Sequence, residues 1–229
     1  MYKNKTFVAI IPARGGSKRL PRKNLLELNG KPLIAYTIKS GQKSKYIDKV
    51  IVTSDDNEIL KISENYGADI IKRPKFLSTD TATTVDTVVH TIENIETYDY
   101  MILLQPTSPL RTYKHIDNAI ELLMNKNARA VVSVSQMEHS PLWSNRLDSS
   151  LSMKGFLKDE VLNKRSQDLE KHYRLNGAIY ICNINSFLEV KSFILQDDIF
   201  AYIMNRESSI DIDEKIDFEL ARLYIKEGK

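Results

Sequence analysis

Residues 7–24 read FVAIIPARGGSKRLPRKN, a short apolar run that leads directly into a loop rich in glycine and cationic side chains. The apolar run, Phe7–Ile11, is typical of a central strand that is buried on both faces of a sheet. Ligands of open α/β sheets bind at the carboxyl ends of such strands. Its position alone therefore makes the following loop a candidate binding site.

Short β-branched runs alternate with amphipathic segments over most of the remaining sequence. This rhythm is typical of βαβ units, so we predict an α/β fold of the Rossmann-like type, with a mainly parallel sheet and helices on both faces. The predicted strands are 7–11, 49–53, 69–72, 101–105, 130–134 and 178–182. The predicted helices are 32–44, 57–66, 84–95, 115–125 and 214–225. In the last helix, one apolar face is expected from Ile216, Leu220, Leu223 and Tyr224.

The chain is long enough for one sizeable core, because it has 229 residues and 42% hydrophobic content. We predict a single domain over residues 1–229, interrupted by an insertion at about residues 138–173. The inserted segment is polar, lacks a long periodic stretch, and contains Pro141, Trp143 and Gly155. A solvated loop of this length is unusual unless it folds against something or performs a task.

Charge and cysteine content exclude several classes of protein. Charged residues make up 28% of the chain, yet the formal net charge is only +3 and both signs are spread along the sequence. No basic block therefore suggests nucleic acid or a membrane surface as a partner. The single cysteine, Cys182, excludes an internal disulfide and indicates a buried structural thiol in a reducing cytoplasm. We expect neither a signal peptide nor a membrane span, because no apolar segment is long enough.

The loop after the first predicted strand has the composition of an anion cradle. Gly15 and Gly16 allow backbone amides to approach an anion closely, and Ser17 adds a hydroxyl. The cations that can neutralise a triphosphate are Arg14, Lys18, Arg19, Arg22 and Lys23. The loop fits neither the Walker A pattern nor the glycine pattern of dinucleotide folds. A flexible, solvated basic loop is the alternative interpretation.

A second candidate site is acidic and lies near the end of the sequence. In Ser209-Ile210-Asp211-Ile212-Asp213, the alternation places both carboxylates on one side of an extended segment and both isoleucines toward the core. Two such carboxylates can hold a hard cation such as Mg²⁺, with phosphate oxygens completing its coordination. Alternatively, Asp213 caps the following helix, and both roles can hold at once.

Motifs over almost the whole chain resemble those of the CMP-sialic acid synthetases and their sugar nucleotidyltransferase relatives. The first motif is the basic loop, which alone would indicate only the wider superfamily. The others, in order, are Leu28-Asn29-Gly30-Lys31-Pro32-Leu33, Thr53-Ser54-Asp55, Arg73-Pro74, Asp80-Thr81-Ala82-Thr83-Thr84, Leu103-Leu104-Gln105-Pro106-Thr107-Ser108-Pro109-Leu110-Arg111, Tyr173-Arg174-Leu175-Asn176-Gly177-Ala178-Ile179-Tyr180 and Ser209-Ile210-Asp211-Ile212-Asp213. The resemblance implies the fold of the nucleotide-diphospho-sugar transferases.

The resemblance implies how the nucleotide is bound. Arg14 and Lys23 would contact the triphosphate, with Asn24 beside them. Arg73 and Thr84 would lie near the cytosine. The other nucleotide-binding residues implied by the basic loop are Ala13, Gly15, Gly16 and Ser17. Converging cations of this kind would stabilise the charge that builds up on departing pyrophosphate.

Two of these motifs also have plain structural explanations. Asp80 or Thr83 could simply serve as the N-cap of the helix that follows them. The two prolines of residues 103–111 could only end a strand, which would leave Arg111 solvated.

The acceptor side is implied by residues from separate motifs. Gln105 would bind the acceptor sugar, while Arg165 and Arg174 would face its carboxylate, which suits the fixed fork of arginine. In the family, the insertion packs across a two-fold axis, so that each subunit completes its partner's site. The resemblance therefore implies a homodimer with a dimerisation arm at about residues 138–173. Leu175 departs from the proline that often stands there, which leaves the exact sugar open.

The activity implied by the resemblance is transfer of CMP from CTP to the anomeric hydroxyl of a nonulosonic acid, with release of pyrophosphate. N-acetylneuraminic acid is favoured, and legionaminic, pseudaminic and 3-deoxy-manno-octulosonic acids are alternatives. Magnesium, or else manganese, would be held by Asp211 and Asp213. The general base would be Asp211 or a metal-bound hydroxide, and no covalent enzyme intermediate is needed.

A nucleotide-binding regulator without activity is a remote alternative on the same fold. The predicted reaction requires the basic loop and the acidic pair to meet around one nucleotide.

Overall fold

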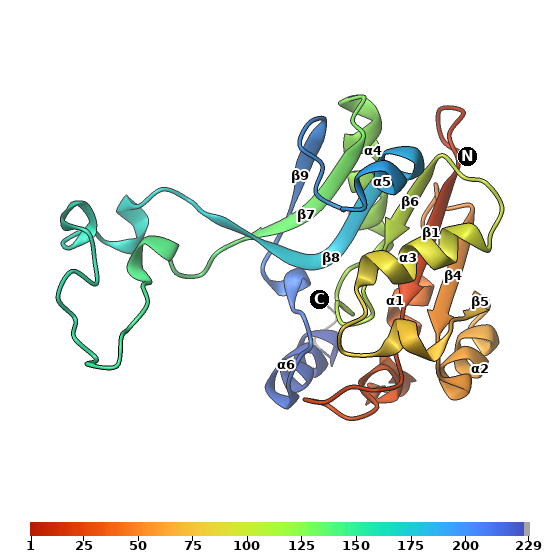
Figure 1. Cartoon of the computed structure of the whole chain (residues 1–229), viewed down its shortest axis with the longest axis horizontal. Helices are drawn as coiled ribbons and strands as arrows, with labels where there is room; N and C mark the ends of the chain where they lie inside the picture. The colour runs from red at the N-terminus through yellow and green to blue at the C-terminus, as the bar shows by residue number, and fades with distance from the viewer. Residues whose placement is uncertain (227–229) are drawn as a thin grey trace.

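The computed structural model describes residues 1–226 and contains a seven-stranded mixed sheet (Figure 1). In sheet order, the strands are β5 (Asp69–Lys72), β4 (Lys49–Ser54), β1 (Phe7–Pro12), β6 (Tyr100–Leu103), β8 (Tyr173–Asn183), β7 (Ala130–Gln136) and β9 (Ile199–Met204). Of these seven strands, β8 alone runs antiparallel to its neighbours. A separate hairpin joins β2 (Glu27–Leu28) to β3 (Lys31–Pro32). The predicted α/β fold with a mainly parallel sheet is confirmed.

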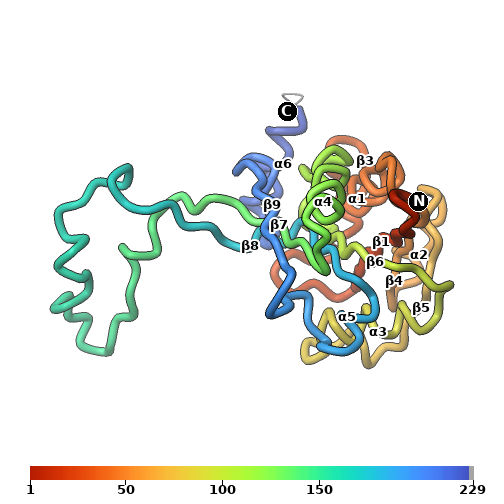
Figure 2. Tube along the Cα trace, turned by 90° about the horizontal axis from the view of Figure 1, so that it is seen from above, coloured from red at the N-terminus to blue at the C-terminus, as the bar shows by residue number. Residues whose placement is uncertain are grey.

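Helices cover both faces of the sheet (Figure 2). On one face lie α1 (Leu33–Gln42), α2 (Asn57–Asn65) and α4 (Tyr113–Asn125). On the other lie α3 (Thr84–Glu93) and α5 (Ile184–Val190). Successive side chains of β1 enter the two cores in turn, since Ile11 belongs to the first and Ile10 to the second. Both faces are therefore apolar, which explains the uninterrupted apolar run of this strand.

The six predicted strands and five predicted helices are all present, with shifts of a few residues at their ends. The strand β9, the helix α5 and the short hairpin of β2 and β3 were not predicted. The helix α5 has only 7 residues, too few for a clear helical period, and its burial depends on Phe187 packing under the sheet. Among residues 1–226, no helix is both long enough and apolar enough to span a membrane.

The last helix, α6 (Lys215–Lys226), buries a different face from the one predicted. Ile216, Leu220 and Leu223 are 71%, 42% and 58% exposed, whereas Phe218 and Ala221 are buried. The helix carries two apolar stripes, and the one with Phe218 packs against the N-terminal loop and the acidic segment. The prediction for this face was wrong because periodicity shows that a stripe exists without showing which stripe meets the core.

Residues 137–172, between β7 and β8, extend away from the body of the molecule, as Figures 1 and 2 both show. The strand ends pair at the base of this arm, where Gln136 faces Tyr173. Beyond the base, the only helical structure assigned to this part of the described chain consists of single 3₁₀ turns. Exposed apolar side chains on the arm are Leu147, Leu151, Met153 and Leu162.

The topology gathers several loops at one edge of the sheet. The loops that follow β1, β4, β5 and β6 all leave from the carboxyl ends of parallel strands. Because β8 is antiparallel, its first half approaches the same edge, and a register shift opposite Ser133 separates this half from the rest. The candidate site lies among these segments.

Candidate active site

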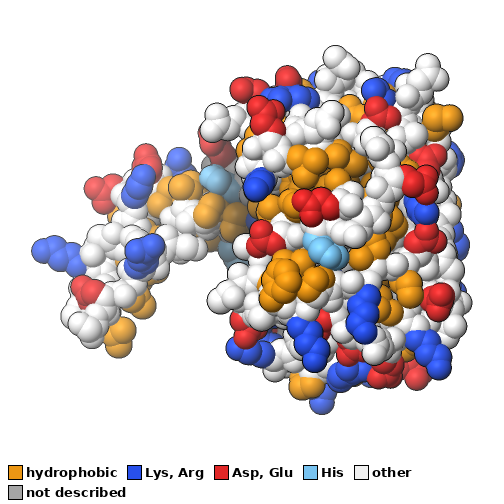
Figure 3. All heavy atoms as spheres, turned by 45° about the vertical axis from the view of Figure 1, so that its right-hand side comes forward, with side chains coloured by type: hydrophobic (Ala, Val, Ile, Leu, Met, Phe, Trp, Pro, Cys, Tyr) orange, Lys and Arg blue, Asp and Glu red, His pale blue; other side chains and the backbone are white. Residues whose placement is uncertain are grey.

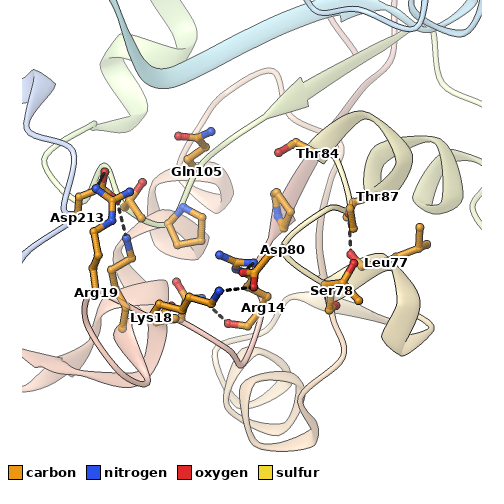
Figure 4. A pocket seen from close by; sticks show the side chains of 18 of the residues that line it. Arg14, Lys18, Arg19, Leu77, Ser78, Asp80, Thr84, Thr87, Gln105 and Asp213 are labelled. Carbon is orange, nitrogen blue, oxygen red and sulfur yellow. Dashed lines mark hydrogen bonds and ion pairs between the residues drawn. The ribbon is translucent and has the colours of Figure 1, made fainter.

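A pocket of about 600 Å³ opens among these loops (Figure 4). The basic loop, the segment between β5 and α3, the turn after β6 and the segment before α6 all contribute to it. The predicted site residues that line it are Arg14, Ser17, Lys23, Asn24, Arg73, Thr84, Gln105, Asp211 and Asp213. Most of the predicted site thus converges, although Arg165 and Arg174 do not line this pocket.

The basic loop and the acidic pair meet directly. The ammonium of Lys23 donates to the carbonyl oxygen of Ile212 at 2.5 Å and lies 3.2 Å from Oδ1 of Asp213. Nη1 of Arg19 lies 3.1 Å from Oδ2 of the same carboxylate (Figure 4). The residue pair Lys23 and Asp213 is separated by 190 positions in the sequence. The basic loop and the acidic segment are therefore adjacent, as the predicted reaction requires.

A different carboxylate, Asp80, holds two further cations of the basic loop (Figure 4). Its oxygens lie 3.2 Å from Nη1 of Arg14 and 2.6 Å from Nζ of Lys18. The hydrogen bond from Lys18 is the main cause that lowers the pKa of Asp80 below its ordinary value. The remaining cation, Arg22, pairs with two carboxylates at the start of α2. All five cations are paired, unlike those of a freely solvated loop.

The glycines of the basic loop have different environments. The Gly15 amide donates to Oδ1 of Asp55 at 3.2 Å, and a Cβ there would lie 2.6 Å from Oδ2 of Asp56. At Gly16, a Cβ would meet nothing within 4 Å. Neither glycine is among the lining residues, and neither is Ala13. Glycine is thus sterically required at position 15, where the backbone approaches a carboxylate rather than open space.

Two internal hydrogen bonds fix the ends of the loop. The Ala13 amide donates to the carbonyl of Thr53 at 3.0 Å, which ties the loop start to β4. Asn24 is buried, and its side-chain amide donates to the carbonyl of Arg14 at 3.1 Å. Asn24 therefore lies beside Arg14, as predicted. Its hydrogen bond to the Arg14 backbone holds the two ends of the loop together.

Asp211 has one carboxylate oxygen, Oδ1, that is buried and has no hydrogen-bond partner. Burial is the main cause that raises its pKa, while a hydrogen bond from Thr107 opposes the rise and the charge of Asp213 adds to it. The Ile212 amide also donates to the Thr107 carbonyl, at 2.8 Å. The turn after β6 therefore holds the acidic segment in place.

Asp211 and Asp213 fit a divalent cation. A bound cation would compensate the buried oxygen that lacks a donor, and the neighbouring isoleucines pack into the core as the alternation predicted. Within residues 1–226, no group of three or more His, Cys, Asp or Glu side chains is arranged as a metal site. Magnesium suits a site of two carboxylates completed by phosphate oxygens and water.

The predicted capping role of Asp213 is taken by another residue. The backbone amides of Asp213 and Glu214 donate to Oδ2 of Asp217, at 3.0 and 2.8 Å. The side chain of Asp213 therefore remains on the cations of the basic loop. At α3, by contrast, Thr83 forms a capping box with Asp86, which confirms the structural explanation for that threonine.

The far end of the pocket is built around Arg73, which is 5% exposed. Its Nη1 donates to the hydroxyl of Thr87 at 3.0 Å, its Nη2 lies 3.9 Å from Asp55, and its Nε has no partner. Burial lowers the pKa of this guanidinium. Thr84 stands at the start of α3 on the same wall (Figure 4). This end offers hydroxyl and guanidinium donors to a polar ring edge.

Gln105 lies between the two ends, at the turn that follows β6 (Figure 4). Its neighbour across the sheet edge is Gly177, which has φ +74. A Cβ on that glycine would lie 2.6 Å from Oε1 of Gln105 and 3.8 Å from Oδ2 of Asp211. The Gly177 backbone thus lies close to the end of the Gln105 side chain, and its positive φ favours glycine at this position.

The predicted acceptor arginines lie outside this pocket. Arg174 lines a second pocket, which shares Asp211 and Asp213 with the first. Arg165 is exposed on the arm and lines neither pocket. The structure therefore brings Gln105 and the acidic pair together, but not Arg165.

Three residues that shape the pocket were not predicted as site residues. Asp80 was interpreted only as a cap, Asp55 appeared only within a motif, and Thr107 was part of a strand-ending turn. Their position in the sequence could have indicated a site role, since each follows a strand or precedes a helix at the carboxyl edge of the sheet. Their contacts depend on segments distant in sequence, which spacing alone does not show.

Cys182 lies outside the pocket. Cys182 is buried, and burial raises its pKa to about 12, which confirms the prediction of an inert thiol. On the molecular face shown in Figure 3, acidic and basic side chains are interspersed.

Comparison with known proteins identifies related sequences and structures. The family model described as Cytidylyltransferase matches residues 8–222. The N-acylneuraminate cytidylyltransferase of Escherichia coli is 41% identical over 216 residues, which cover 94% of this chain and 51% of that protein. The chain thus spans about half the length of that relative. The CMP-N,N'-diacetyllegionaminic acid synthase of Legionella pneumophila is 37% identical and is covered to 94%, with 93% of this chain aligned.

A solved structure shares the fold. It is a CMP:2-keto-3-deoxy-manno-octonic acid synthetase complexed with CTP, with a TM-score of 0.75 and 17% identity. The alignment covers 98% of this chain and 100% of that one. The family match and the sequence relatives support what the motifs implied: this chain belongs to the CMP-sialic acid synthetase family of cytidylyltransferases.

Proposed function

We propose that this protein transfers CMP from CTP to the anomeric hydroxyl of a nonulosonic acid and releases pyrophosphate. The observation that carries the proposal is the contact of Lys23 with Asp213 inside one pocket. The contact brings two groups of side chains together. The cations of the basic loop suit a triphosphate, and the two carboxylates suit the divalent cation that accompanies it.

The proposed nucleotide position follows the charges along the pocket. Arg14 and Lys23 hold the β- and γ-phosphates and stabilise the charge of departing pyrophosphate. Arg73 and Thr84 receive the cytosine at the far end, where a base of the wrong shape would leave buried polar groups unpaired. The α-phosphorus then lies between the two ends, close to Gln105 and Asp211.

Asp211 and Asp213 are the residues that would hold magnesium, or manganese, in this pocket. When bound, the cation supplies charge neutralisation and orientation to the phosphates. Gln105 orients the acceptor, and the acceptor hydroxyl attacks the α-phosphorus in line. The proposed acceptor of the hydroxyl proton is the carboxylate of Asp211, which lines the same pocket as Gln105.

N-acetylneuraminic acid is the favoured acceptor, and legionaminic, pseudaminic and 3-deoxy-manno-octulosonic acids are the alternatives. The pocket that Arg174 lines meets the nucleotide pocket at the acidic pair, so an acceptor carboxylate there could reach an arginine. Each acid is incubated with CTP and Mg²⁺, and pyrophosphate release is measured. Release with none of them, despite CTP binding, would favour a regulator and overturn the proposal.

We also propose that the protein works as a homodimer. The arm extends from the body, and both the arm and the exposed stripe of α6 carry apolar side chains that nothing in the described chain covers. A second copy that packs against these surfaces would bury them and could bring Arg165 to the neighbouring site. Sedimentation velocity tests the assembly, and a monomer at enzymatic concentrations would contradict it. A cytoplasmic location remains a prediction, based on the single cysteine.

A further inference from the structure

Arg111 is a buried arginine to which the proposed reaction gives no role. It is 1% exposed, and no carboxylate of residues 1–226 forms an ion pair with it. Burial without a counter-ion lowers its pKa to about 9. Burying a guanidinium without a counter-ion costs free energy. The hydrogen bonds of Arg111 compensate for part of this cost. The alternative of a solvated arginine at this position is contradicted.

The guanidinium of Arg111 joins two strands beyond the point where their ladder ends. The antiparallel pairing of β6 with β8 stops at Leu103 and Tyr180. Past that point, Nη1 of Arg111 donates to the carbonyl oxygens of Gln105 at 3.2 Å and Ala178 at 3.0 Å. One side chain therefore replaces the missing strand-to-strand hydrogen bonds.

The two bridged segments carry the walls of the proposed acceptor site. Gln105 presents its side chain to the pocket, and Ala178 directly follows Gly177. The Gly177 backbone lies close to Gln105 and Asp211, because a Cβ there would lie 2.6 Å from Oε1 of the first and 3.8 Å from Oδ2 of the second. A shift of either segment would therefore change the distance between the side-chain amide of Gln105 and the carboxylate of Asp211.

Nη2 of Arg111 anchors the bridge to the helix layer. It lies 3.4 Å from Oγ of Ser40 in α1, and the Gln105 carbonyl also accepts from Thr37 of the same helix at 3.4 Å. The bridge is thus fixed to a packed helix rather than to a mobile loop. The contacts proposed for CTP lie on the loop after β1 and between β5 and α3, and Arg111 touches neither.

We propose that Arg111 is a positioning residue that fixes Gln105 and the Gly177 backbone beside Asp211, and so sets the acceptor half of the site without affecting the CTP half. This inference rests on the proposed CMP transfer. It predicts that loss of the Arg111 hydrogen bonds changes turnover and the acceptor KM but leaves CTP binding unchanged. General destabilisation of the fold would affect both.

The test uses Arg111→Met, which keeps a similar volume without the donors, and Arg111→Lys, which keeps the charge but loses the fork. We expect turnover with saturating CTP to fall about 10- to 100-fold in the methionine variant, and less in the lysine variant, with a raised KM for the acceptor. The Kd of CTP, measured by calorimetry with Mg²⁺, should stay within about twofold.

Asp117→Ala is the matched control, because Asp117 is also buried and accepts from Ser44 Oγ at 2.6 Å and the Lys45 amide at 3.1 Å, outside the pocket. It should lower Tm while leaving the kinetics of the folded enzyme unchanged. Wild-type kinetics in folded Arg111→Met, or an equal loss of CTP affinity, would overturn the inference. Should the methionine variant not fold, Arg111→Lys decides by the same criteria. A wild-type protein that binds CTP but releases no pyrophosphate with any acceptor would refute the proposed function itself, and the inference with it.

Discussion

The two halves of the pocket differ in how completely one chain builds them. On the proposed nucleotide side, every cation of the basic loop already pairs with a carboxylate of the same chain. On the acceptor side, Gln105 stands in the pocket, whereas Arg174 lies in an adjoining one and Arg165 on the extended arm. Under the proposed function, this difference means that one chain supplies the groups for the nucleotide, while the choice of acceptor depends on exposed segments and on the proposed dimer.

The largest expected effect is at the point shared by both halves. Asp211→Asn should lower turnover by about 10³-fold or more, because the proposed cation and proton acceptor are both lost. Equally rapid pyrophosphate release by this variant would contradict the role of Asp211.

The same variant should show higher thermal stability without metal. Burial raises the pKa of Asp211, so the carboxyl stabilises the fold when protonated, and this contribution is lost as pH rises through the raised pKa. At neutral pH the asparagine avoids that loss. Thermal melting in buffer with and without Mg²⁺ checks this, and the gain in Tm from Mg²⁺ should be smaller in the variant.

The next largest effect concerns Arg165 and the proposed homodimer. Arg165→Ala should reduce turnover about 10- to 100-fold with little change in CTP affinity, because the carboxylate of the acceptor loses its partner. Mixing Arg165→Ala with Asp211→Asn should then restore activity, up to about a quarter of the sites, since a mixed dimer contains one complete site. The mixture is tested after joint refolding, and absence of any recovery would argue against a shared site.

A smaller effect is expected at the acceptor wall. In Gly177→Ala, the new Cβ would lie 2.6 Å from Gln105 Oε1 on a backbone with φ +74, so the acceptor KM should rise about tenfold while CTP binding changes little. Gly67→Ala is the control, because Gly67 has φ +80 beside α2, away from the pocket. Equal kinetic losses in both variants would show that only folding was disturbed.

The smallest effect probes the nucleotide half. Asp80→Asn removes the partner of Arg14 and Lys18, which CTP would otherwise have to displace. All three side chains are substantially exposed, so the KM for CTP should fall only about two- to fivefold, with less dependence on salt. A large loss of CTP affinity would instead assign Asp80 a direct role in binding.

Sequence predicted the parts of the site that depend on local order. The run Phe7–Ile11 showed a strand buried on both faces, and the alternation of residues 209–213 showed where two carboxylates point. It did not predict which apolar stripe of α6 would be buried. It also did not predict that Arg111 would be enclosed, because its three partners come from separate segments.

By itself, then, the sequence determined most strands and helices, the basic loop and the acidic pair, since side-chain periodicity and composition act over a few neighbouring residues. The tertiary structure alone decided that Lys23 meets Asp213, that Gly177 packs against Gln105, and that Arg165 stands apart on the arm. The physical reason is that sheet order and the reversed direction of β8 place distant segments side by side, and neither is encoded in local spacing.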